Sequence, residues 1–309
     1  MAEESIAIVG AGAMGGVFGA LLAESGADVT LLDPDARLVD AVNARGVTLL
    51  ESGGERNVRI AATTDPGSLR EPSVAIFFVK CHHTKAAAES VRPALGPDAT
   101  VVSLQNGWGN ADVLAGLFGV ERLVLGVTYT SATTVEPGMI RTSGAARTVL
   151  GALDGGQARV TSIERALRKA GFATELPDRV LDEIWKKLVL NAATLPTAAL
   201  TGLTAGALVS TDEMRQLVDT AAAEAVAVGR AQGFDVSVDE RLQSIHAVLE
   251  AAGSGKASML QDVEAGRPTE IDVISGAVLR KAQEHDIDTP ATRALYALVT
   301  GLEKARNQR

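Results

Sequence analysis

The chain has 309 residues, more than a single hydrophobic core usually serves, so the sequence predicts two domains. Its 46% hydrophobic and 22% charged residues are typical of a globular protein and exclude wholesale disorder. The 38 acidic residues outnumber the 29 basic ones and give a net charge of −9, so neither nucleic acid nor an anionic membrane is an expected partner.

An uncharged stretch at residues 5–23 has the hydropathy of a signal peptide or a marginal membrane span. The acidic residues Glu3 and Glu4 precede it, whereas a signal peptide starts with basic residues. Five glycines also lie within the stretch, which is a poor composition for a lone helix. We therefore expect a cytoplasmic protein without a membrane segment.

Short apolar runs and helical segments alternate through the first half of the chain. Residues 5–9 predict a strand, which a glycine-rich turn joins to a helix at 17–25 and to a second strand at 28–32. A helix with Thr84 as its N-cap is expected at 84–91. Further strands are expected at 74–79, 100–104, 123–129 and 147–150. Because these runs are largely apolar, they are typical of a mostly parallel sheet covered on both faces.

The strand-like runs almost cease beyond Pro177. Helices are expected instead at 182–193, 212–231, 238–251 and 271–284. The sequence therefore predicts an α/β plus all-α protein, with an N-terminal Rossmann dinucleotide-binding domain at residues 1–177 and a helical domain at 178–309. We expect the helical domain to bind the substrate and to mediate the contact if the chain forms a homodimer.

A glycine-rich turn with the GxGxxG pattern follows the first strand and opens the first helix. Gly10 would permit a tight turn, Gly12 would let the backbone approach a pyrophosphate, and Gly15 would let helix and strand pack closely. The helix N-terminus would supply N–H donors and a positive dipole to the phosphates. The expected cofactor-binding residues of this turn are Gly10, Ala11, Gly12, Ala13, Met14 and Gly15.

Asp33 directly follows the second predicted strand, about 20 residues beyond the glycines. A carboxylate at this place would accept hydrogen bonds from the adenosine ribose hydroxyls and would repel a 2′-phosphate, which favours NAD(H) over NADP(H). The alternative is that Asp33 is only a turn residue before Pro34. Arg37 lies close by and could stack on adenine or meet a phosphate.

Lys187 and Asn191 are four residues apart, so they share one face of the first helix of the second domain. Their neighbours are mainly apolar, and burial disfavours the charge of a lysine. A positioned ammonium would stabilise and protonate the oxygen that gains charge when a ketone accepts hydride. The alternative is a lysine that reaches past apolar neighbours to solvent. Lys186 points about 100° away from Lys187 and is expected at the surface.

Two other polar residues are ambiguous by themselves. Glu270 is expected at the start of a helix, where the helix dipole favours a carboxylate, so it could be a capping residue. Asn106 precedes Gly107 directly after a strand, and Asn-Gly is a common turn.

Together these motifs resemble those of the ketopantoate reductase (2-dehydropantoate 2-reductase) family over nearly the whole chain. The resemblance implies an N-terminal Rossmann domain, a C-terminal helical domain and an active site in the cleft between them. It also implies NAD(P)H-dependent reduction of a 2-oxo acid to a D-2-hydroxy acid, first of all of 2-dehydropantoate to pantoate in pantothenate biosynthesis. The stretches that carry the resemblance are 10–15, 79–80, 105–107, 185–191, 258–262 and 269–272.

The resemblance further implies roles for individual residues. Lys187 would be the general acid at the ketone, and Glu270 would assist it. Asn106 would bridge the nicotinamide and the substrate, with Lys80 near the same junction. The polar groups of the substrate would be bound by Asn191 and Ser258.

Two residues depart from the family pattern. Asp33 stands where members that prefer NADPH usually carry a basic or neutral residue, and Leu195 stands where members often carry a second asparagine. Both departures favour an alternative within the family, an NAD-dependent D-2-hydroxyacid dehydrogenase for bulky branched or aromatic 2-oxo acids. NADP(H) stays the expectation from the family and NAD(H) the expectation from Asp33.

Functions of other classes account for the same residues less well. A non-catalytic dinucleotide-sensing regulator would keep the glycine turn but would not need Lys187 and Glu270. A 3-hydroxyacid dehydrogenase can also pair lysine and asparagine on a helix, but the block at residues 258–272 argues against it. Neighbouring Cys81, His82 and His83 cannot easily converge on one ion, so no metal is expected. A single cysteine also excludes an intrachain disulfide.

Overall fold

The computed structural model describes residues 5–153 and 156–306, which form two compact units. One unit contains the chain up to Gln105 together with Asn110–Val180. The other contains Asn106–Gly109 and the chain from Leu181 onward. The tetrapeptide Asn106–Gly109 therefore packs with the helical unit, although the order of the chain places it amid the strands of the first one.

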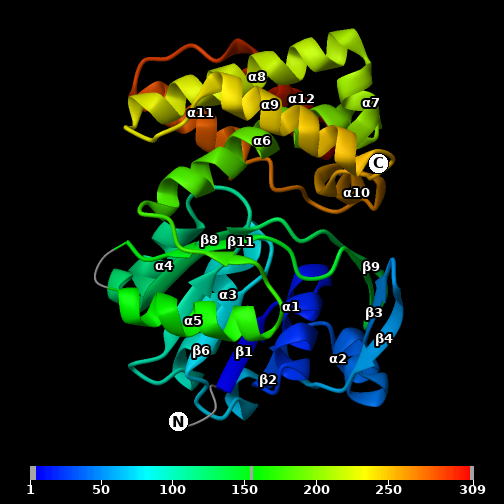
Figure 1. Cartoon of the computed structure of the whole chain (residues 1–309), viewed down its shortest axis with the longest axis vertical. Helices are drawn as coiled ribbons and strands as arrows, with labels where there is room; N and C mark the ends of the chain where they lie inside the picture. Colours follow the sequence, from blue (N-terminus) through cyan, green and yellow to red (C-terminus); the bar gives the residue numbers. More distant parts are fainter. Residues whose placement is uncertain (1–4, 154–155, 307–309) are drawn as a thin grey trace. The chain divides into compact units, whose positions relative to one another are not determined.

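An eight-stranded sheet forms the centre of the first unit (Figure 1). Its order is β12-β11-β8-β7-β6-β1-β2-β5, and the six strands from β5 to β8 run parallel. These six strands follow the order 3-2-1-4-5-6 of doubly wound dinucleotide-binding sheets, which confirms the predicted Rossmann domain. The strands are β1 (Ser5–Val9), β2 (Asp28–Leu32), β5 (Ala61–Thr63), β6 (Val74–Phe77), β7 (Thr100–Ser103), β8 (Leu123–Thr128), β11 (Thr148–Gly151) and β12 (Thr174–Glu175).

Helices cover both faces of this sheet. α1 packs beside α5, and α3 packs beside α4. The chain order reverses between β1 and β6, so right-handed crossovers place α1 on one face and α3 and α4 on the other. The helices are α1 (Ala13–Glu24), α2 (Ala36–Arg45), α3 (Thr84–Val91), α4 (Asn110–Phe118) and α5 (Gln157–Lys169).

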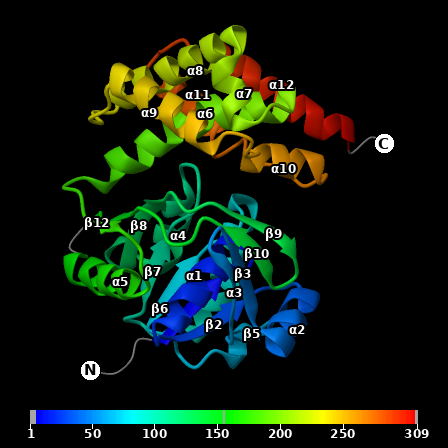
Figure 2. The ribbon, with the colours of Figure 1, turned by 45° about the vertical axis from the view of Figure 1, so that its right-hand side comes forward.

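A second, four-stranded sheet, which the sequence did not predict, packs on α1 (Figure 2). It has the order β4-β3-β10-β9, with β3 (Val47–Glu51), β4 (Gly54–Val58), β9 (Ala132–Glu136) and β10 (Met139–Thr142). A Cβ on Gly16 would overlap the Cδ1 atom of Ile140, so a glycine in α1 is what lets β10 approach the helix.

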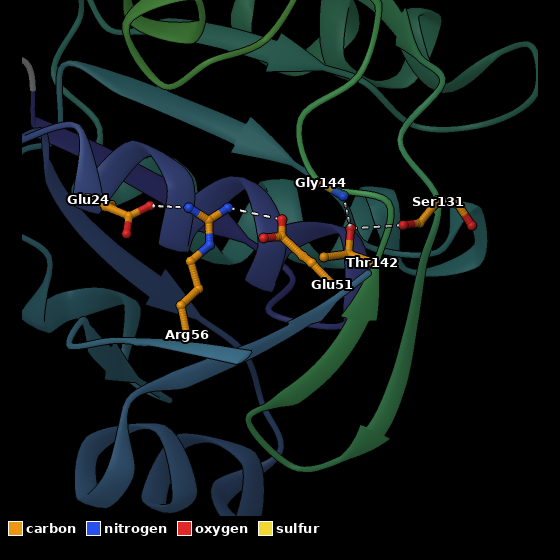
Figure 3. Close-up of polar contacts among 6 residues, drawn as sticks. All are labelled: Glu24, Glu51, Arg56, Ser131, Thr142 and Gly144. Atoms are coloured by element: carbon orange, nitrogen blue, oxygen red, sulfur yellow. Dashed lines mark hydrogen bonds and ion pairs between the residues drawn. The ribbon is translucent and has the colours of Figure 1, made fainter. Parts of the chain in front are cut away.

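Polar contacts also hold this small sheet (Figure 3). Arg56 of β4 donates to Glu24 of α1 at 2.7 Å and to Glu51 of β3 at 3.0 Å. The hydroxyl of Thr142 donates to the carbonyl of Ser131 at 2.9 Å and accepts from the N–H of Gly144 at 3.0 Å. The carboxylates and the guanidinium are partly exposed, so each ion pair contributes about 1 kcal/mol at most.

The second unit is helical, and its described residues contain no strand. No described helix of the chain is both long enough and apolar enough to cross a membrane. The predicted α/β plus all-α class is confirmed by this pair of units. The helices are α6 (Val180–Thr201), α7 (Ala205–Ser210), α8 (Asp212–Ala231), α9 (Val238–Ala252), α10 (Ser258–Glu264), α11 (Ser275–Glu284) and α12 (Pro290–Arg306).

Several helix ends differ from the expectation, among them the start of α1, which lies at Ala13 instead of residue 17. α6 continues through Pro196 to Thr201 instead of ending at residue 193, because packing sustains the helix past the proline. α11 begins at Ser275 rather than at residue 271, after an irregular turn. Thr84 is the first residue of α3 and not its N-cap, because its buried hydroxyl donates to Asn110 and accepts from Gln105.

Three aromatic side chains lie at the centre of the helical unit. The ring centroids of Trp108, Trp185 and Phe234 are 5.1–5.4 Å apart. The indole N–H of Trp185 donates to the carbonyl of Ala225 in α8 at 2.9 Å, which satisfies the one polar group of a fully buried side chain. A Cβ on Gly229 would overlap this indole, so α8 carries a glycine where Trp185 packs.

Candidate active site

The glycine turn joins β1 to α1 at the carboxyl end of the parallel sheet. Gly10 has φ +96°, and a Cβ there would lie 2.7 Å from the backbone nitrogen of Val79. A Cβ on Gly15 would overlap the carbonyl oxygen of Gly10. Gly12 differs from both, because it is exposed and a Cβ there would meet no protein atom within 4 Å. Gly10 and Gly15 thus serve the packing of the chain itself, whereas the space beside Gly12 is open.

The N-terminus of α1 is suited to an anion. Its N-cap is Gly12, which offers no side-chain acceptor, and the first turn contains no acidic residue. The first N–H groups of a helix have no acceptor within the helix and carry its positive dipole end. A phosphate is the acceptor that this arrangement favours.

Asp33 connects β2 to the glycine turn. Its Oδ2 accepts from the N–H of Ala11 at 2.8 Å, and its Oδ1 accepts from the N–H of Asp35 at 3.0 Å. The carboxylate is half-buried beside the turn, so Asp33 is both a turn residue and a fixed acceptor next to the dinucleotide motif. Arg37 is 87% exposed and pairs with Asp35 at 3.4 Å, which lowers the pKa of the Asp35 carboxyl.

The loop after β6 carries Lys80, which is half-buried. Gln105, just beyond β7, donates from its side-chain nitrogen to the carbonyl of Val79 and to the hydroxyl of Thr84, each at 2.8 Å. The hydroxyl of Ser103 donates to the oxygen of the same amide at 3.1 Å. Gln105 therefore fixes the backbone before Lys80 at the point where the strand order reverses. No role for Gln105 was predicted from the sequence, although a polar residue directly after an apolar strand was a usable signal.

Cys81, His82 and His83, at which no metal was expected, form a short 3₁₀ helix, Cys81–His83. The rings of His82 and His83 meet edge to face at 4.3 Å. Within the described residues, no group of three or more His, Cys, Asp or Glu side chains could hold a metal ion.

Lys187 and Asn191 lie on the same face of α6, in the helical unit. Asn191 is 7% exposed and Lys187 is half-buried. Burial lowers the pKa of Lys187 to about 8, and the negative charge of Glu270 acts in the opposite direction. Lys186, which was expected at the surface, has a side chain only 20% exposed and forms an ion pair with Glu183 at 2.8 Å.

Glu270 is 6% exposed and lies in the turn that precedes α11. The expectation that it begins a helix was wrong, because α11 has its N-cap at Ile274. The backbone carbonyl of Glu270 accepts from the N–H groups of Val273 and Ile274, each at 3.2 Å, so the local sequence closes a turn instead of a helix.

The turn after Glu270 also holds the segment with Asn106. The N–H of Trp108 donates to the carbonyl of Val273 at 2.8 Å. Gly107 has φ +86°, and a Cβ there would lie 2.7 Å from the same carbonyl oxygen. Asn106, which is half-buried, therefore belongs to the same unit as Lys187 and Glu270, and its Asn-Gly pair forms a tight turn as well.

Ser258 is the first residue of α10, and it is exposed. The structure thus gathers Lys187, Asn191, Glu270 and Asn106 in the helical unit and leaves Ser258 on its surface. Apart from Asn106, the residues expected to bind the dinucleotide lie in the first unit. A half-buried lysine with a pKa near 8 and a carboxylate that favours its charged form can hold a proton at neutral pH and release it to a developing alkoxide.

Comparisons with known proteins give one consistent result. The family described as "Ketopantoate reductase PanE/ApbA" matches residues 6–155, and its C-terminal counterpart, "Ketopantoate reductase PanE/ApbA C terminal", matches residues 179–303. The 2-dehydropantoate 2-reductase of Mesorhizobium japonicum is 34% identical over 97% of this chain and 98% of that protein.

Solved structures are similar over the full length. A PanE/ApbA family ketopantoate reductase from Ralstonia eutropha has a TM-score of 0.89 and 31% identity, covering 98% of this chain and 99% of that one. A D-mandelate dehydrogenase in complex with NADH and anilino(oxo)acetate has a TM-score of 0.92 and 26% identity, with the same coverage.

Proposed function

Because the chain belongs to the ketopantoate reductase family, whose members are NAD(P)-dependent oxidoreductases acting on a CH–OH group, we propose that it reduces 2-dehydropantoate to pantoate. The observation that carries the proposal is the partly buried Lys187, whose pKa is lowered by burial, with Glu270 acting on its charge and Asn191 on its helical face. Partial burial of a charged lysine lowers the stability of the folded protein. Proton donation to a ketone oxygen is a function that explains why a lysine stands at this position.

The glycine turn fits a dinucleotide. Gly12 offers open space where a pyrophosphate would lie, and α1 offers uncapped N–H groups beside it. Asp33 is held in place by the N–H of Ala11 and would take the adenosine ribose. When bound, the reduced nicotinamide supplies the hydride that the 2-oxo carbon accepts.

The residues of the helical unit would do the rest of the chemistry. Lys187 would donate its proton from Nζ to the oxygen of the substrate as negative charge develops there. Glu270 would favour the charged form of Lys187 and so keep that proton available near neutral pH. Asn106 and Asn191 would bond polar groups of the substrate and orient its carbonyl. Ser258 would complete the set only if a bound substrate reaches the exposed start of α10.

We propose NADH as the preferred cofactor. The fixed carboxylate of Asp33 would accept both ribose hydroxyls of NADH, whereas a 2′-phosphate would bring a like charge close to it. Such a pair costs on the order of a few kcal/mol in a partly buried site. Arg37 pairs with Asp35 at 3.4 Å, and its exposed guanidinium would have to leave this weak ion pair to compensate a phosphate.

A second candidate is the reduction of a bulky branched or aromatic 2-oxo acid. Leu195 lies one turn beyond Asn191 on the face of Lys187, and it is half-buried. An isobutyl group cannot bond a substrate hydroxyl but can pack against an apolar substituent. The similar D-mandelate dehydrogenase, which was solved with NADH and anilino(oxo)acetate, supports this candidate.

Initial-rate kinetics with two substrates and two cofactors separate the candidates. We expect higher kcat/KM for 2-dehydropantoate than for phenylglyoxylate, and higher kcat/KM with NADH than with NADPH. The reverse order of substrates would establish the second candidate. No turnover of either acid, with tight binding of NADH, would indicate a regulator instead. Leu195→Asn should lower the activity with phenylglyoxylate more than that with 2-dehydropantoate.

Matched variants test the residues. Lys187→Ala should lower kcat by at least about 100-fold, the low end of what general acid catalysis contributes, whereas Lys186→Ala should be nearly silent. Equal losses in the two variants would refute the role of Lys187. Asp33→Asn should reduce the preference for NADH, and an unmoved cofactor ratio would show that Asp33 does not face the ribose.

A further inference from the structure

The segment that carries Glu270 has little regular structure of its own. It runs between the end of α10 at Glu264 and the start of α11 at Ser275. Two side chains of α12 hold it from outside. Glu303 accepts from the backbone N–H of Thr269 at 2.7 Å, and the hydroxyl of Tyr296 donates to Asp272 at 2.7 Å. Since 296 and 303 are seven residues apart, the two side chains lie on one face of α12.

The contact of Glu303 is more buried than that of Tyr296 and lies closer to Glu270 in the chain. Thr269 is 7% exposed and Glu270 is 6% exposed, whereas Asp272 is exposed. A hydrogen bond from an N–H group to a carboxylate is stronger than a neutral one, and a less polar environment strengthens it further. The N–H that Glu303 binds belongs to the residue directly before Glu270, so of the two contacts from α12 this one lies nearer to Glu270, whose own carbonyl is already bonded within the turn.

α12 is itself tied to the helix that carries Lys187. Glu224 of α8 accepts from the N–H groups of Ala291 and Thr292, each at 2.8 Å, at the start of α12. The next residue of α8, Ala225, accepts from the indole of Trp185 in α6. α12 packs against α8 and α11 within this unit. One turn of α8 therefore holds both α6, with Lys187, and α12, with Glu303.

We propose that Glu303 is a positioning residue, which fixes the carboxylate of Glu270 relative to the Nζ atom of Lys187 through its bond to the N–H of Thr269. The proposal rests on the proposed function, in which Lys187 donates a proton and Glu270 assists it. Glu303 touches neither reacting group, so its effect passes entirely through the backbone at 269–270. Loss of the bond lets this backbone shift, and a misplacement of about 1 Å at an active site can cost about 100-fold in rate.

Two substitutions separate positioning from charge. Glu303→Ala removes the acceptor and the negative charge, whereas Glu303→Gln removes the charge but keeps a carbonyl acceptor at the same place. We expect Glu303→Ala to lower kcat for reduction by about tenfold or more and Glu303→Gln to stay within about threefold of the wild type. Glu284→Ala is the control, because this exposed residue pairs with Lys281 of its own helix, α11, and lies outside the segment.

The pH profile and hydrogen exchange give readouts that a merely structural role would not move. In Glu303→Ala the alkaline loss of reductase activity should begin at lower pH, because a displaced Glu270 supports the charge of Lys187 less. Amide exchange in a peptide containing residues 269–273 should become at least about tenfold faster in Glu303→Ala and stay unchanged in Glu303→Gln.

Either of two results would overturn the proposal. Equal effects of Ala and Gln would mean that the charge of Glu303 acts directly, and unchanged exchange in Glu303→Ala would mean that the bond does not hold the segment. The exchange experiment needs no turnover. If Lys187→Ala kept full activity, the proposed function would fail, while the exchange of residues 269–273 would still decide the role of Glu303.

Discussion

Raising the pH from about 7 to about 9 should slow reduction about tenfold. The proposed proton donor, Lys187, has its pKa lowered by burial from 10.5 to about 8. With a pKa of about 8, the charged fraction is about 90% at pH 7 and about 10% at pH 9. A lysine with an ordinary pKa would stay charged over the whole range, and the rate would be constant. The size of the fall therefore reports the environment of Lys187.

The assay is kcat/KM for the 2-oxo acid at saturating cofactor and constant ionic strength. Reduction needs the protonated amine and must decline as pH rises, whereas the reverse oxidation needs the neutral amine and must increase over the same range. Glu270→Gln should move the decline to lower pH, because Glu270 raises the pKa of Lys187. Lys186→Ala should leave the profile unmoved. A rate that is constant up to about pH 9.5 would refute the assignment of Lys187.

Four glycine substitutions test the packing arguments. Gly12→Ala should keep the melting temperature of the wild type, because its Cβ would meet no protein atom. The same Cβ would enter the space for the phosphate and should raise the Kd for NADH by about tenfold. An unchanged Kd in a fluorescence titration would contradict this expectation. Gly15→Ala should instead lower the free energy of unfolding by about 1–3 kcal/mol or more, since its Cβ would overlap the carbonyl of Gly10. Gly229→Ala should lower the free energy of unfolding, measured by urea denaturation, by about the same amount, because it displaces the indole of Trp185. Gly301→Ala is its control, because open space surrounds this position of α12, and it should be neutral or raise the free energy of unfolding by up to about 1 kcal/mol. Similar losses of stability in both variants would argue against the indole contact.

Local signals account for what could be predicted. Residues 5–32 predict a strand, a glycine turn, a helix and a second strand from patterns of neighbouring residues alone. The change to helical periodicity beyond Pro177 is a local pattern of the same kind. Asp212–Ala231 was predicted with its observed ends, because its apolar residues recur at helical spacing between clear boundaries. Lys187 and Asn191 could be paired because their spacing alone places them on one face of a helix.

Distant pairings could not be predicted. β3 and β10 are neighbours in the small sheet although about 90 residues separate them, and β4 carries Glu55, Arg56 and Asn57 where a strand is usually apolar on one face. The bond from Thr269 to Glu303 joins two segments that no periodicity relates. The helix expected at 182–193 was predicted too short, because α6 continues through Pro196 to Thr201, where tertiary packing overrides the local preference against proline.

The place of Asn106–Gly109 sets a limit on the modularity of this enzyme. Consider a chimaera in which the helical portion of a relative replaces that of this chain from residue 180 onward. Trp108 lies before this junction, so its indole would pack against the helices of the relative instead of its own. The cavity left beside Trp185 and Phe234, or the clash that replaced it, would cost several kcal/mol. A recombination that preserves the fold must therefore carry this tetrapeptide with the C-terminal half, although more than 70 residues of the Rossmann portion separate the two in the gene.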